Sequence, residues 1–301
     1  MPTAYTRGGI ITAVLVAALI GLLAGIVIQG LTATSDVSWL QLSALALSSA
    51  FAVKVADILY QEFRRRKDKT SSATKFVDEH LDPLLKSADE VVGKLHSLAT
   101  EDFKSLADKE LALTPVADHD FGSLLYLFGR LWARIEILKL EGLAIAISED
   151  PRGAMLQSFL ACLESTKVRI VDRTAQRAIG EILMKATPPR GTMGYVEFVR
   201  SVETSEETRR WIEPLAHVFR RTHHTEDRQR LLQYGAVIHA LIDCLDPRHL
   251  VTSDRPSNPN KLSERTRKAL RYRVFGVYLT FVSDATKYVG KSRTRRRSTN
   301  A

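Results

Sequence analysis

The chain has 301 residues and a formal net charge of +9 at pH 7, and the excess lies in only two segments. Residues 64–69 carry +4 and the tail from Lys287 onward carries +6, whereas residues 70–286 balance to zero. This placement favours contact with an anionic lipid surface, or plain disorder of the tail, over nucleic-acid binding. The two cysteines, Cys162 and Cys244, form neither a disulfide framework nor a CxxC metal motif, and we expect two buried, reduced thiols.

Residues 9–33 form an apolar run with no charged side chain and one amide, Gln29. About 20 apolar residues wound as a helix match the thickness of a bilayer core, so this run predicts a transmembrane helix. The alternative is a secretory signal peptide, which has a basic start and an apolar core of about 7–15 residues. The run is longer than that and follows a single charge, Arg7, so a retained anchor is the favoured interpretation.

Residues 39–60 are apolar enough to form a second span, with Lys54 and Asp57 near its end. These two residues lie three apart and can pair on one helix face. Because a basic cluster follows within about two turns, we interpret both side chains as snorkelling to the interface. Two alternatives stay open: the pair lines an ion path, or the whole segment is an amphipathic helix lying on the membrane.

The order of charges around these spans predicts the orientation of the chain. The connector, residues 34–38, has no basic residue, whereas Arg64, Arg65, Arg66 and Lys67 follow the second span. Lys and Arg concentrate on the cytoplasmic side of membrane proteins. We therefore expect a multi-pass protein of a bacterial inner (plasma) membrane, with its large domain in the cytoplasm and these four residues in contact with anionic lipid headgroups.

Small residues recur every four positions in both predicted spans, so they share one face of each helix. Such faces let membrane helices approach closely, and they predict packing within the hairpin or between subunits of a homo-oligomer. The two stripes are Ala13, Ala17, Gly21 and Gly25 in the first span, and Ala44, Ser48, Ala52 and Ala56 in the second.

The remainder of the chain predicts an all-α fold: a two-helix transmembrane hairpin followed by a helical-bundle domain. Apolar residues recur at three and four, and no strand-like alternation stands out. The predicted parts are a membrane hairpin (1–63), a basic juxtamembrane linker (64–75), a helical cytoplasmic domain (76–289) and a basic disordered tail (290–301). Within the domain we expect helices at residues 76–98, 123–147, 151–168, 171–184, 205–219, 228–245 and 262–289, with a short helix or turn at 193–202. We expect a break near Pro83, at the start of the first of these helices.

The helix predicted at residues 123–147 is the most apolar of the domain, and we expect it at the centre of the core. Arg130 and Arg134 lie four apart on it and repel unless acids from other helices meet them. A substrate-binding arginine pair is the functional alternative to a structural network. The candidate buried ion-pair network consists of Arg130, Arg134, Glu136, Arg177 and Glu181.

The chain contains no P-loop, GxGxxG, GxSxG or HExxH motif, and the sequence predicts no cofactor, no metal site and no catalytic residue. His217 and His224 with Glu213 could be imagined as metal ligands, but His223 and His224 are adjacent in a charged stretch typical of a surface loop. His239 lies in an apolar pattern, which is typical of a core histidine whose hydrogen bonds are satisfied.

Five short motifs stand out across most of the domain, at residues 82–85, 126–138, 175–181, 195–198 and 245–247. Together they resemble a family of uncharacterised, mostly helical bacterial proteins with an N-terminal membrane segment. The family has no known activity, so the resemblance assigns no role to any residue here.

These patterns together favour a membrane-anchored binding or scaffold protein that acts at the cytoplasmic face, with the lipid bilayer as its first partner. One alternative is a membrane-active effector or small oligomeric channel gated by the cytoplasmic domain. A second is an enzyme with an unrecognised site near Arg130 and Arg134, although a non-enzymatic role is favoured.

Overall fold

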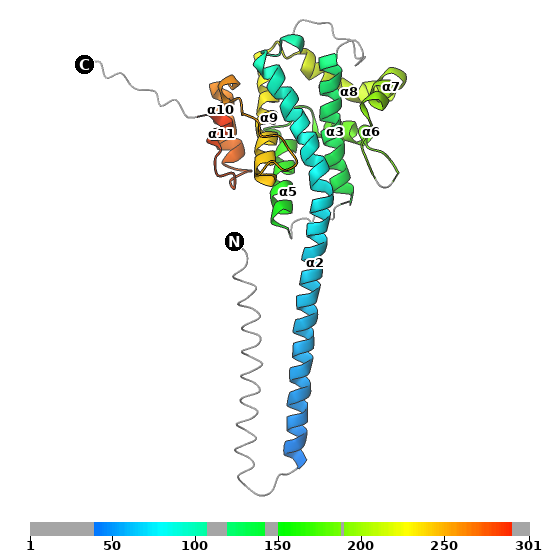
Figure 1. Ribbon diagram of the computed structural model, residues 1–301, viewed down its shortest axis with the longest axis vertical. Helices are drawn as coiled ribbons and strands as arrows, with labels where there is room; N and C mark the ends of the chain where they lie inside the picture. The colour runs from blue at the N-terminus through cyan, green and yellow to red at the C-terminus, as the bar shows by residue number, and fades with distance from the viewer. Residues whose placement is uncertain (1–38, 107–118, 142–149, 188–189, 291–301) are drawn as a thin grey trace, which may run out of the picture. The chain divides into compact units, whose positions relative to one another are not determined.

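The computed structural model describes residues 39–106, 119–141, 150–187 and 190–290, and within these ranges the protein is all-helical (Figure 1). An isolated bridge between Met184 and Thr192 is the one β-type pairing there. The elements, in chain order, are α2 (Trp39–Thr100), η1 (Lys104–Leu106), α3 (His119–Glu141), α5 (Pro151–Glu164), α6 (Arg173–Leu183), α7 (Tyr195–Thr204), α8 (Glu206–Arg220), α9 (Thr225–Leu245), η2 (Pro259–Lys261), α10 (Glu264–Ala269), η3 (Leu270–Phe275) and α11 (Thr286–Val289).

Across the described ranges, no helix combines the length and apolarity that crossing a membrane requires. The first predicted span, residues 9–33, lies outside these ranges. The second, residues 39–60, is helical and forms the beginning of α2.

The chain divides into two compact units, Met1–Lys69 and Thr70–Ala301. Residues 64–75, predicted as a linker, are helical throughout and belong to α2.

The break predicted near Pro83 is also absent. The helix continues through the proline, which costs one backbone hydrogen bond. Leu81, Leu84 and Leu85 around it are buried, so packing of this face stabilises the helix through Pro83.

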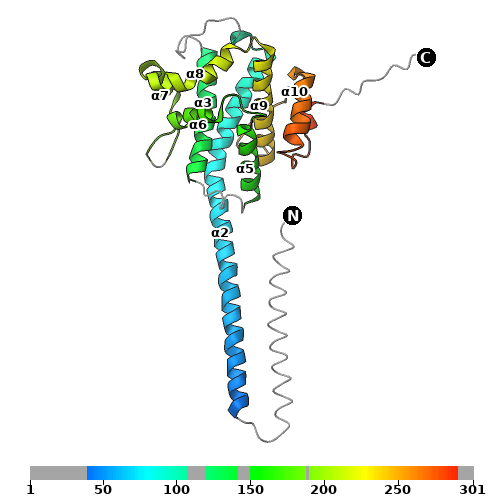
Figure 2. The same cartoon turned by 180° about the vertical axis from the view of Figure 1, so that it is seen from behind.

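The core of the second unit is built around α3, which packs against α6, α7 and α8 (Figure 2). The predicted central helix is confirmed in the described residues, since most of α3 is buried. Phe121, Phe128 and Trp132 of α3 meet rings from two other helices, Phe219 of α8 and Tyr234 of α9. The indole Nε1–H of Trp132 donates to the Tyr234 hydroxyl at 2.8 Å, so the two polar atoms of this aromatic cluster satisfy each other.

Polar caps begin several helices at the residues where the sequence allows them. Pro151 occupies the first turn of α5, as predicted, and the Asp150 carboxylate accepts the Arg152 N–H at 2.8 Å. Asp172 and Ser205 cap α6 and α8 in the same way. These caps satisfy N–H groups that have no partner within the helix.

The predicted single helix at residues 262–289 is wrong. Ser263 caps the short α10, a π-helical turn follows as η3, and helix resumes only at α11. Gly276 ends η3, and the Val, Thr and Ser residues that follow have weak helix propensity. Two other predictions agree with the structure. The helix α9 ends at Leu245, directly before Asp246-Pro247, and residues 195–204 form the short helix α7.

Candidate functional site

The segment of α2 from Ile58 to Lys67, here called the interfacial segment, exposes its apolar side chains. Ile58, Leu59, Tyr60 and Phe63 are each about half exposed or more. The basic residues that follow directly, Arg64, Arg65 and Lys67, are also exposed, while the Arg66 side chain lies outside the description. Along the helix, Ile58, Leu59 and Tyr60 come first, the exposed Gln61 and Glu62 follow, and Phe63 directly precedes the cations.

Lys54 and Asp57, which precede the interfacial segment, form no ion pair with each other in the described part of the helix. The Asp57 carboxylate instead accepts a hydrogen bond from Gln61 Nε2 at 3.0 Å. The interpretation of Lys54 and Asp57 as a pair lining an ion path therefore lacks the contact on which it depends.

The small-residue stripes fall on parts of the chain whose side chains are not described. Ala13, Ala17, Gly21 and Gly25 lie outside the described residues altogether. The backbone of Ala44, Ser48, Ala52 and Ala56 is helical within α2, so these four positions share one helix face, and their contacts are outside the description. The packing role of both stripes stays a prediction.

The predicted arginine pair separates into two different environments. Arg130 Nη1 contacts Glu90 Oε2 of α2 at 2.6 Å, so an acid from another helix does meet it. Arg134 is half-buried, and its Nε atom has no hydrogen-bond partner among the described residues. Two effects lower the pKa of the Arg134 guanidinium: burial, which is the larger, and repulsion from Arg130.

The acidic part of the predicted network forms a separate cluster with members that the sequence reasoning missed. Glu136 is 5% exposed, and its carboxylate lies 2.7 Å from Lys139 Nζ and 3.7 Å from Arg177 Nε. Arg177 also contacts Glu181 at 2.9 Å, in an exposed i,i+4 pair. Lys139 reaches Glu164 of α5 as well, which links α3 to α5. The i,i+3 spacing of Glu136 and Lys139 is a sequence signal that could have revealed this pair.

The histidines considered as metal ligands do not come together. Glu213 pairs with Arg220 at 2.6 Å, and His217, His223 and His224 are exposed. In the described ranges, no three His, Cys, Asp or Glu side chains are arranged to hold a metal ion. Of the two cysteines, Cys162 is buried, which raises the pKa of its thiol to about 12, whereas Cys244 is only half-buried.

A partly buried polar cluster at the C-terminal end of α9 was not expected from the sequence. Asp243 Oδ2 accepts from the Tyr288 hydroxyl at 2.5 Å and contacts Lys287 Nζ at 2.6 Å. Asp243 Oδ1 faces His249 Nε2 at 3.6 Å and His239 Nε2 at 3.8 Å. His239 is buried as predicted, but its Nε2 atom has no hydrogen-bond partner in the described residues, so it is not the satisfied core histidine we expected.

Asp246 fixes the chain that leaves this cluster. Its carboxylate accepts the N–H groups of Leu250, Val251 and Thr252 at 2.9–3.0 Å, together with the Thr252 hydroxyl. Burial alone raises the pKa of Asp246, but these hydrogen bonds outweigh it and lower the pKa below its usual value. The loop after α9 is thereby held against the helix end, with His249 beside Asp243.

The burial of His239 predicts a pH dependence of stability. Burial lowers its pKa, although Asp243 opposes this effect, and Lys287, His249 and Asp254 are the other charged groups nearby. As pH falls below about 6.5, the unfolded chain binds a proton at this position before the folded protein does, so the free energy of unfolding falls. We expect His239→Gln to lose less stability than the wild-type protein between neutral pH and pH about 5.

Urea titrations of both proteins at a series of pH values measure this difference. The same substitution at the exposed His217 is the control and should follow the wild-type curve. Parallel curves for the wild-type protein and His239→Gln would contradict the prediction.

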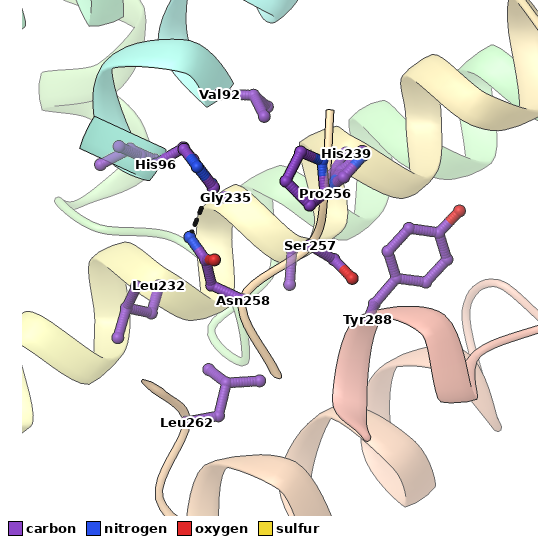
Figure 3. A pocket seen from close by; sticks show the side chains of 12 residues that line it. Val92, His96, Leu232, Gly235, His239, Pro256, Ser257, Asn258, Leu262 and Tyr288 are labelled. Atoms are coloured by element: carbon purple, nitrogen blue, oxygen red, sulfur yellow. Dashed lines mark hydrogen bonds between the residues drawn. The ribbon is translucent and has the colours of Figure 1, made fainter. Parts of the chain in front are cut away.

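The second unit contains a small pocket and an open groove. The pocket, of about 50 Å³, is lined by α2, α9, α11 and the segment around η2, and Asn258 hydrogen-bonds to His96 at its edge, at 2.9 Å (Figure 3). It is too small for an organic ligand, because small-molecule pockets typically have volumes of about 300–1,000 Å³. The open groove, of about 670 Å³, lies between the loop after α5, the first turns of α9 and α10. Neither of them is lined by Arg130 or Arg134.

No family model, curated protein or solved structure matches this chain. The resemblance to uncharacterised membrane-anchored helical proteins, drawn from five short motifs, stays a prediction.

Proposed function

We propose that this protein is a membrane-anchored binding or scaffold protein, held by a two-helix hairpin with its folded domain at the cytoplasmic face of a bacterial inner membrane. The observation that carries the proposal is the interfacial segment, in which four exposed apolar and aromatic side chains precede three exposed cations.

The physical argument starts from the cost of this arrangement in water. Exposed apolar surface costs about 25 cal/mol per Å², and a bilayer edge relieves that cost. Tyr and Phe are suited to the boundary between acyl chains and headgroups, and the cations that follow meet phosphates, at about 1 kcal/mol for each residue. The uncharged run at residues 9–33 supplies the first span of the proposed hairpin.

A binding or scaffold role fits the folded unit better than catalysis near the arginines. Arg130 is already held by Glu90, and Glu136 by Lys139 and Arg177, so these charges stabilise contacts between helices. α2 carries both the interfacial segment and the buried face that begins at Val77. A single helix thus joins the proposed membrane contact to the folded core. Oligomerisation through the small-residue stripes belongs to the same proposal.

The test combines fractionation with two C-terminal reporters, one fluorescent only in the cytoplasm and one active only after export. We expect the full chain in the membrane fraction, resistant to carbonate extraction, with a cytoplasmic signal. Reversing the charges of Arg64, Arg65 and Lys67 to Glu should increase the exported signal, because the positive-inside bias is lost.

The matched control reverses three exposed cations of the folded unit, Arg200, Arg210 and Lys268, and should leave the orientation unchanged. A full chain recovered in the soluble fraction would refute the anchor. An exported signal from the wild-type protein would refute the orientation.

A further inference from the structure

The open groove of the second unit has the volume of a ligand site and a polar lining. Its volume of about 670 Å³ lies within the range of about 300–1,000 Å³ that is typical of small-molecule pockets. Twelve of its sixteen lining residues are polar or charged, and none is aromatic. A nucleobase or an apolar helix therefore has little surface to pack on, whereas a compact polar ligand has many donors.

Two cations at the groove are not neutralised by an acid. Lys167, on the loop after α5, and Arg265, on α10, line the groove, are exposed, and make no ion pair with any described residue. The other two cations, Arg169 and Arg230, have acids near them, Asp172 at 3.2 Å and Asp227 at 3.8 Å. Glu226 also lines the groove, is exposed, and makes no ion pair with a described residue. The unpaired side chains there thus carry two positive charges and one negative charge, so their net charge is positive.

The walls of the groove are held in place before any ligand arrives. The side-chain amide of Gln229 in α9 makes two hydrogen bonds to the backbone of the segment that leads into α10. Its Nε2 donates to the Lys261 carbonyl at 2.9 Å, and its Oε1 accepts from the Ser263 N–H at 2.7 Å. Gln233, one turn further on, donates to the Lys167 carbonyl at 2.5 Å. α9 and α10 lie side by side in both views (Figures 1 and 2). A preformed site of this kind loses little conformational entropy on binding.

We propose that this groove binds a small, multiply charged anion, carrying phosphate or carboxylate groups, with Lys167 and Arg265 as its direct cationic contacts. Charge-assisted hydrogen bonds from ammonium and guanidinium groups to such oxygens are the stronger class of polar contact. The basic segments of the chain itself, residues 64–69 and the tail, have the wrong sign to occupy the groove. The proposal is independent of membrane anchoring.

The experiment is isothermal titration calorimetry of the full chain in a neutral detergent at low ionic strength. Pyrophosphate and citrate serve as probes, which separates phosphate from carboxylate chemistry. We expect saturable binding of at least one probe, weakened by added salt, since exposed charges are screened. The double variant Lys167→Glu/Arg265→Glu should weaken that binding at least about tenfold.

The matched control is Arg200→Glu/Lys268→Glu, which makes the same change of net charge at exposed cations that do not line the groove. It should bind as the wild-type protein does, and circular dichroism should show the same helix content for all three proteins. Absence of binding to both probes would overturn the proposal. An equal loss of affinity in the two double variants would also overturn it, because the attraction would then come from net charge and not from this groove.

Discussion

Replacing Phe128 with Ala is expected to lower the free energy of unfolding by about 3–5 kcal/mol. Phe128 is fully buried in α3, and its ring centroid lies 5.8 Å from that of Trp132, 5.5 Å from Phe219 and 5.6 Å from Tyr234. Truncation removes the ring from three neighbours that belong to three helices. The neighbours cannot close the cavity without moving those helices, so the cost lies at the upper end of core truncations.

Urea denaturation of the full chain in mild detergent, followed by circular dichroism, measures this loss. The control is Tyr272→Ala, which removes a ring that is 66% exposed and should change stability by less than about 0.5 kcal/mol. Because small and medium domains have only about 5–15 kcal/mol of stability in total, the loss expected for the Phe128 variant is a large fraction of the stability of the protein. A loss below that of the Tyr272 variant would contradict the aromatic core described above.

Replacing Gly180 with Ala is expected to destabilise the protein by about 1–3 kcal/mol, although helix propensity alone predicts a gain of nearly 1 kcal/mol. A Cβ at Gly180 of α6 would lie 2.9 Å from both the carbonyl carbon and the carbonyl oxygen of Trp132. These are backbone atoms of α3, so the clash is relieved only if the two helices move apart. α3 and α6 also share an extensive interface, over which the strain is spread.

The matched control is Gly235→Ala in α9, which makes the same change at another mid-helix position. There the new Cβ would lie 2.9 Å from Leu95 Cδ1, the end of a flexible side chain that can rotate away. We expect a change near zero, because the gain in helix propensity offsets that small rearrangement. Thermal unfolding curves of the wild-type protein and the two variants measure these changes in stability. A Gly180→Ala variant more stable than the wild type would show that α3 and α6 are not so closely packed.

Local sequence patterns predicted the position of a helix correctly where that helix buries one continuous face. The apolar spacing within residues 123–147 predicted the buried helix α3, and Asp246-Pro247 marked the end of α9 correctly. The same reasoning failed at Pro83 and across residues 262–289, where tertiary packing and a glycine overrule the local pattern. A proline is tolerated on a helix when the surrounding face is buried, and a periodic pattern alone does not reveal that burial.

The contrast between what local patterns predict and what packing decides is stronger for the polar sites. The predicted network placed Arg177 near Glu136, and the two side chains lie 3.7 Å apart, but Arg177 also pairs with Glu181 of its own helix. Sequence spacing could not place Glu164 beside Lys139, or Lys287 and Tyr288 beside Asp243, because those partners are separated by more than twenty residues. The groove was also missed, because Lys167 and Arg265 come to line the same groove only when α5, α9 and α10 have packed.

The sequence by itself determined that this protein is helical, which of its helices is the most buried, and where its excess charge lies, because all three depend on residues that are neighbours along the chain. Only the tertiary structure decided which charges are neutralised and which stay free. Arg130 is paired, whereas Lys167 and Arg265 have no acidic partner among the described residues, and that outcome depends on the distance between elements that are far apart in sequence. Coulomb attraction falls with that distance, and it is the folding of the chain that sets it.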